Sequence, residues 1–140
     1  MKKIIWLLAF ICFPVFSLNA QSTVKIIVNS SSPVSSVSKS DLLNIFLKKV
    51  SVFSNGGAAK PVDQVPSSAA RATFSRIYLG KPVFAVKNYW DQQKFTGAGI
   101  PPEEKTNDAE VISFVKSTDG AIGYISAATD ASGVKVIEVK

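Results

Sequence analysis

Two serines and one arginine at a predicted helix start are the residues best suited to chemistry in this sequence. Ser67 and Ser68 follow Pro66, and Arg71 lies one helical turn further along. The first amides of a helix lack partners within it and carry about half a positive charge. Serine hydroxyls and an arginine fork would add donors there, so these residues predict a weak ligand-binding site for an oxyanion. A structural interpretation also stays open, in which Ser67 caps the helix, Ser68 is exposed and Arg71 is solvated.

Residue types that catalyse reactions or bind metals are scarce. Histidine is absent from the sequence, and Cys12 is its only cysteine. Most metal sites and the usual Ser-His-Asp and Cys-His nucleophiles are therefore excluded. The adjacent carboxylates Glu103 and Glu104 follow Pro101-Pro102 and indicate an exposed loop instead of an acid–base pair. We predict no catalytic, cofactor-binding or metal-ligating residues and no enzymatic activity.

The excess of positive charge is modest and scattered. Of the 16 basic residues, Lys2 and Lys3 lie at the N-terminus, and 10 acidic residues oppose the others. Beyond residue 20, Lys48-Lys49 is the only adjacent basic pair. Nucleic-acid binding requires a concentrated basic patch, so nucleic acid is not a predicted partner. A mild positive field still favours anions.

The first twenty residues have the order of a secretory signal peptide. Lys2 and Lys3 precede an apolar run at 4–16, and small residues follow at 17–20. The run is shorter than the roughly 20 apolar residues of a membrane span, and Pro14 interrupts it. We therefore expect a cleaved signal at 1–20, one domain at 21–140, no membrane insertion after cleavage, and a periplasmic location.

Apolar periodicity and turn residues predict an α/β fold, with one mixed sheet flanked by about four helices. The predicted strands are 24–29, 120–125 and 134–139, a hairpin covers 50–62 around Asn55-Gly56-Gly57, and helices cover 38–49, 67–79, 83–94 and a segment from 107. Tyr89, Trp90 and Phe95 form either a partner-binding platform or part of the core, and their helical spacing favours the core.

Four segments, in order, resemble the phosphate ABC transporter substrate-binding proteins. They are NSSSPVSSVSKSDLLNIF at 29–46, Arg71-Ala72-Thr73-Phe74 after the two serines, FTGAGIPP at 95–102 and GAIGY at 120–124. The resemblance implies a periplasmic-binding-protein-like lobe, inorganic phosphate or a similar oxyanion as the ligand, and a link to transport.

The chain also departs from that family. A complete receptor has two α/β lobes and is roughly twice as long, so this chain resembles the second lobe alone. The family's Ser-Gly-Thr signature would fall on Ser68, Ala69 and Ala70, and its preceding arginine on Gln64 or Asp63. Of the phosphate ligands that the resemblance implies, only Ser68 is kept, assisted by Ser67.

Two functions follow as hypotheses. The first is an accessory or reduced phosphate-binding protein of the periplasm. The alternative is a non-catalytic cell-envelope module that keeps the lobe fold and binds another protein, or a second copy of itself, without a ligand. The second hypothesis predicts an exposed apolar patch.

Overall fold

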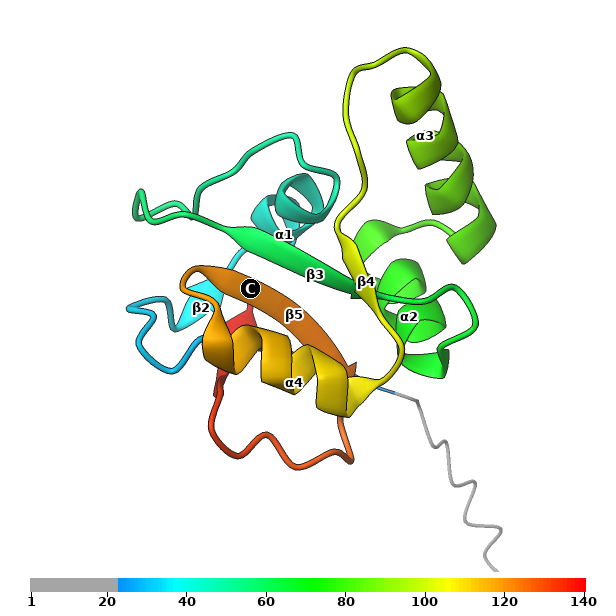
Figure 1. The fold of residues 1–140 in the computed structure, drawn as a ribbon. Coiled ribbons are helices and arrows are strands. Elements are labelled where there is room, and N and C mark those ends of the chain that lie inside the picture. Colours follow the sequence, from blue (N-terminus) through cyan, green and yellow to red (C-terminus); the bar gives the residue numbers. More distant parts are fainter. Residues whose placement is uncertain (1–22) are drawn as a thin grey trace, which may run out of the picture.

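A computed structural model describes residues 23–140, so the predicted signal peptide at 1–20 lies outside the described residues. Within this range the chain forms one mixed sheet of six strands in the order β2-β6-β1-β5-β3-β4 (Figure 1). The strands are β1 Val24–Val28, β2 Ser36–Val37, β3 Lys60–Gln64, β4 Glu103–Lys105, β5 Ala121–Ser126 and β6 Lys135–Val139. β1 is antiparallel to β5 and β6, whereas β3 is parallel to β5 and β4, and β2 is parallel to β6.

Helices cover both faces of the sheet, which confirms the predicted α/β class. They are α1 Lys39–Phe46, α2 Ala69–Phe74, the π-helical continuation η1 Ser75–Leu79, α3 Val83–Phe95 and α4 Asp108–Ser117. In β1, Ile26 and Val28 face the larger core under α1 and α2, whereas Ile27 faces α4. This alternation is the period of a strand that is buried on both sides. No helix among residues 23–140 is long and apolar enough to cross a bilayer.

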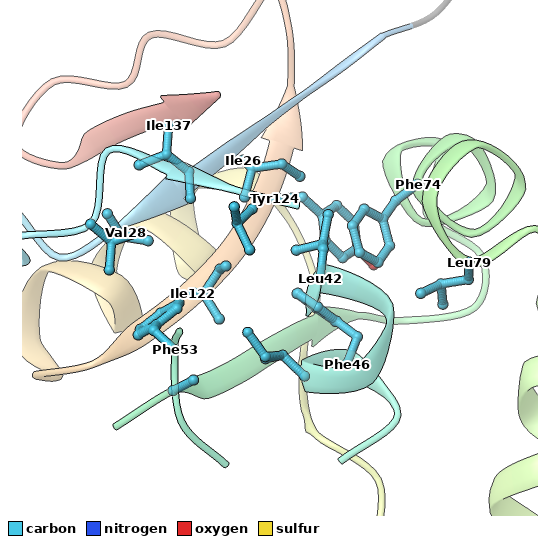
Figure 2. Packing of buried hydrophobic residues seen from close by; sticks show 14 of the residues in the cluster. Ile26, Val28, Leu42, Phe46, Phe53, Phe74, Leu79, Ile122, Tyr124 and Ile137 are labelled. Atoms are coloured by element: carbon cyan, nitrogen blue, oxygen red, sulfur yellow. The ribbon is translucent and has the colours of Figure 1, made fainter. Parts of the chain in front are cut away.

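Aromatic rings join the sheet to α1 and α2 in the larger core. Phe74 stacks on Tyr124 with ring centroids 4.0 Å apart, and Phe46 lies 4.6 Å from Phe74 (Figure 2). All three side chains are buried. The Tyr124 hydroxyl also accepts a hydrogen bond from the Gln64 amide, so this stack fixes α2 beside the polar end of β3.

The predicted hairpin at 50–62 is only partly formed. Its turn exists, because Val52 and Ala58 make an isolated antiparallel bridge around Gly56, whose φ is +89°. The returning strand β3, however, pairs with β5 and β4. Burial explains the difference: Val62 is fully buried against α4, whereas Val52 is half exposed. Val62 reaches this buried position only when β3 pairs with β5.

Both edges of the sheet are short. β2 has two residues, and β4 has three, with the sequence Glu-Glu-Lys. The prediction of a loop at Glu103 and Glu104 is therefore wrong, although both residues are exposed as expected. Their backbone pairs with β3, which brings Glu104 beside Asp63.

Candidate functional site

The candidate site lies where β3 ends and α2 begins. Ser68 is the N-cap of α2: its hydroxyl accepts a hydrogen bond from the Arg71 amide at 3.2 Å. The same hydroxyl donates to Gln64 Oε1 at 2.6 Å. The interpretation in which Ser67 caps the helix is therefore wrong, and Ser67 is exposed at the surface. Ser68 is fixed by two partners of its own chain.

Arg71 is buried, with 2% of its surface exposed, so the interpretation of a solvated Arg71 is also wrong. Its Nη1 donates to the Gln64 carbonyl and lies 3.4 Å from Asp63 Oδ2 and 3.4 Å from Glu104 Oε1. Its Nε is buried and meets no acceptor within residues 23–140. Arg71 therefore pairs with carboxylates of the protein itself, whereas the sequence predicted that it would pair with a bound oxyanion.

Asp63 is the buried counterion of Arg71. The Tyr124 hydroxyl and the Gln64 amide both donate to Asp63 Oδ1. Burial raises the pKa of Asp63 above its ordinary value, although Arg71 and these hydrogen bonds oppose the rise. Burial, together with the adjacent charge of Asp63, raises the pKa of the Tyr124 hydroxyl, which therefore remains a donor.

Gln64 connects this ion pair to α4. Its side chain is 1% exposed, and its Nε2 donates to Asp108 Oδ1 at 2.9 Å and to the Tyr124 carbonyl at 3.0 Å. The resemblance would place an arginine at Gln64 or Asp63. In this chain both positions instead carry residues whose polar atoms are satisfied within the fold.

Asp108 completes the network at the first residue of α4. It accepts hydrogen bonds from Gln64, the Ser126 amide at 3.1 Å and the Thr129 hydroxyl at 2.6 Å. Partial burial disfavours its charged form, but these hydrogen bonds outweigh that effect and lower its pKa. Asp63 and Glu104 lie beside the cation of Arg71, and Asp108 is linked to this ion pair through the Gln64 side chain.

Neutral donors without an acceptor lie at the start of α2. The amides of Ala69 and Ala70 meet no acceptor in the described part of the chain, and the Ser67 hydroxyl is exposed. A shallow cavity of about 290 Å³ lies beside the two alanines, lined in part by Ala69, Ala70 and the hydroxyl-bearing Thr23, Thr73 and Ser126. Amide and hydroxyl donors of this kind bind oxyanions without a countercharge.

Sequence reasoning found Ser67, Ser68 and Arg71 but missed the groups that hold them. Asp63 and Gln64 end the β3 sequence Lys-Pro-Val-Asp-Gln, and a polar pair shortly before a predicted helix start was the available signal. Glu104 and Asp108 gave no such signal, because they approach from a segment more than 30 residues away. Among residues 23–140 no cluster of three or more metal-ligating side chains occurs.

The fold resembles that of solved phosphate receptors. An ABC-type phosphate transport receptor from Vibrio cholerae matches 84% of this chain with a TM-score of 0.65 and 16% identity. PstS from Borrelia burgdorferi matches 85% with a TM-score of 0.66 and 16% identity. A protein from Clostridium perfringens, solved with bound phosphate, matches 84% with a TM-score of 0.64 and 18% identity.

The match covers 46%, 47% and 45% of those chains, respectively, so this chain spans less than half of the length of the receptors. At these identities the likeness establishes the fold, and it confirms the predicted single lobe of periplasmic-binding-protein type. No protein-family profile matches the sequence, and no curated protein matches it.

Proposed function

We propose that the protein is a non-enzymatic, reduced relative of the phosphate receptors that binds phosphate or a similar oxyanion weakly at the start of α2. The observation that carries the proposal is the set of unpaired donors at this helix start, in a fold shared with phosphate receptors. The ligand would accept from the amides of Ala69 and Ala70 and from the Ser67 hydroxyl. Ser68 would order the helix start, and Arg71 would supply positive charge from below the surface.

The local charges limit the affinity. Glu104 lies 3.4 Å from Arg71 and its side chain is 37% exposed, so its carboxylate competes with an incoming anion for the same cation. Each hydrogen bond at a wet site contributes only about 1 kcal/mol. We therefore expect a dissociation constant near 1 mM, which corresponds to about −4 kcal/mol.

A proline substitution tests the amide donors directly. Ala69 is the first helical residue, a position where proline is tolerated, and Ser68 before it has φ −69° and ψ 132°, as a residue preceding proline requires. Ala69→Pro therefore removes one amide hydrogen and leaves the helix intact. The matched control, Ala69→Ser, keeps that hydrogen.

The measurement is a titration of the ¹⁵N-labelled protein with phosphate and with sulfate, followed by amide chemical shifts. We expect the Ala69 and Ala70 signals to move, and Ala69→Pro to weaken binding about fivefold, the effect of one hydrogen bond. Glu104→Gln should strengthen binding, because it removes the competing carboxylate. Unmoved signals at about 10 mM of either anion, ten times the expected constant, would refute the proposal.

We also propose that the protein acts in the periplasm after removal of residues 1–20. The charged, apolar and small-residue segments at 1–20 support this location. Expression of the full chain in a Gram-negative host should yield a periplasmic protein whose measured mass corresponds to a chain that starts at Gln21. An uncleaved cytoplasmic protein would contradict it.

A further inference from the structure

α3 presents one entire face to solvent. Its inner side packs through Val86 and Trp90, and the Tyr89 hydroxyl donates to the Leu47 carbonyl. Its outer side contains two large exposed apolar residues, Phe84 at 68% and Phe95 at 90% exposure. Figure 1 shows α3 at the margin of the molecule, away from the sheet. Trp90 therefore belongs to the core as predicted, whereas Phe95 does not.

The outer face has the spacing of a helix–helix seam. Phe84, Asn88, Asp91 and Phe95 follow one another at intervals of four, three and four residues, so they form one stripe along α3. The two phenylalanines are about 16 Å apart along the helix axis. Between them Lys87 and Lys94 pair with Asp91, at 2.5 Å and 3.5 Å. The stripe is apolar at both ends and charged in the middle.

The stripe is symmetric about its midpoint, between Tyr89 and Trp90. In an antiparallel pair of α3 helices related by a two-fold axis there, Phe84 of each copy meets Phe95 of the other. Asn88 then meets Asp91, and the amide of Asn88 can donate to that carboxylate. A two-fold interface requires this kind of self-complementary surface. We propose that the outer face of α3 binds a second copy of this chain in antiparallel orientation.

The charges select the antiparallel orientation. In a parallel, in-register pair Asp91 would face Asp91, and Lys87 would face Lys87, so like charges would oppose each other at the centre. In the antiparallel pair Lys87 faces Gln92, and no like charges face each other along the stripe. Like charges placed opposite one another are destabilising, whereas amide–carboxylate contacts are not.

The dimer is weak, because the surface is small. Seven exposed side chains make up the outer face, namely Phe84, Lys87, Asn88, Asp91, Gln92, Lys94 and Phe95. A standard interface uses about 20–30 residues on each side. We therefore expect a monomer–dimer equilibrium with a constant of tens to hundreds of micromolar, near the weak end of specific association.

Sedimentation equilibrium of the purified full-chain product tests the proposal. The double variant Phe84→Ser, Phe95→Ser should be at least about tenfold weaker in dimerisation, since aromatic anchors carry most of an interface. Both side chains are exposed, so the fold is kept, and an unchanged thermal transition verifies that. A wild-type protein that is monomeric at about 1 mM, or a dimer that the double variant leaves unaltered, would overturn the proposal.

Two substitutions of Asn88 test the orientation of the dimer, because they add opposite charges and should shift dimerisation in opposite directions. Asn88→Lys would place a cation opposite Asp91 and should tighten the dimer about fivefold, whereas Asn88→Asp would oppose two carboxylates and weaken it. Ser113→Lys and Ser113→Asp are matched controls, because Ser113 is an exposed position on α4. If both Asn88 variants shift the equilibrium in the same direction, the antiparallel register is refuted.

Cross-linking gives an independent readout. In a Cys12→Ser background, Lys87→Cys and Gln92→Cys proteins should form a disulfide when mixed, because residues 87 and 92 face each other. Neither protein alone should cross-link efficiently. Efficient cross-linking of Lys87→Cys alone would indicate the parallel arrangement and overturn the proposal.

Discussion

At the scale of single residues, Arg71 is held by partners on both β3 and β4. It joins the end of β3 to β4 through Asp63 and Glu104, and its side chain is almost completely buried. A buried charge without its partner costs far more than a neutral residue of similar shape. Arg71 therefore acts first as a structural cation and only indirectly as a group that attracts ligands.

Arg71→Met should lower the free energy of unfolding by about 3–5 kcal/mol, because it leaves the Asp63 carboxylate buried without a cation. The double variant Asp63→Asn, Arg71→Met should recover part of that loss, since the neutral amide introduced at position 63 can still accept from Tyr124 and Gln64. Urea unfolding followed by circular dichroism measures both values. Equal stability of Arg71→Met and wild type would contradict the assigned ion pair.

At the scale of elements, α4 and the sheet approach each other closely at Gly123 in the middle of β5. A Cβ added there would lie 2.7 Å from Val62 Cγ1 and 2.8 Å from Val111 Cγ1. Both valines are fully buried, so neither has free space to move into. The missing side chain of Gly123 is what lets β3, β5 and α4 pack together.

Gly123→Ala should destabilise the protein by about 1–3 kcal/mol through overpacking. Gly99→Ala is the matched control, because the nearest atom to its added Cβ is a Trp90 ring carbon at 3.9 Å, an ordinary contact. Thermal unfolding of both variants checks the comparison. A similar melting temperature for Gly123→Ala and the control would show that the sheet yields more easily than its packing implies.

The elements also show which parts of the fold were predictable from sequence. Helix starts were predicted correctly where the signal is local: Ser38 accepts from the Asp41 amide and Asn107 from the Glu110 amide, each three residues on. The pairing of β3 was not, since a strand's partner depends on which faces are buried across the whole sheet.

The candidate site was likewise only partly predictable from sequence. Ser68 and Arg71 were found because their spacing at a helix start is a local pattern. Glu104 was missed because β4 approaches β3 only in the folded chain, and Asp63 and Gln64 were missed because the sequence does not show that these polar residues are buried. The sequence could therefore not predict that the Arg71 side chain points inward, where it forms an internal ion pair instead of contacting a ligand.

At the scale of the whole molecule, two carboxylates give the stability opposite dependences on pH. The raised pKa of Asp63 means that its contribution is greatest below its ordinary value of 3.8 and decreases as pH rises through the folded-state pKa. The lowered pKa of Asp108 means that its contribution is present above 3.8 and is lost as pH falls through the folded-state pKa. The two effects partly cancel in acid.

Asp108→Asn should therefore be less stable than wild type at pH 7, with a difference that shrinks below about pH 4, where the wild-type carboxylate takes up a proton more readily in the unfolded chain than in the folded one. Urea unfolding at pH 7, 5 and 3 measures the difference. The exposed Asp119, changed to Asn, is the control. A difference in stability that stays constant from pH 7 to 3 would contradict the prediction, because it would show that the effect of Asp108 does not depend on its ionisation.

The short, charged margins of the sheet bear on how the protein behaves when crowded. A strand from another molecule could extend the ladder by only two residues at β2 or three at β4, and at β4 it would meet the charges of Glu103, Glu104 and Lys105. Short edges and charged edges both disfavour amyloid-type stacking. The edges of the sheet therefore disfavour fibril formation between copies, even at high protein concentration.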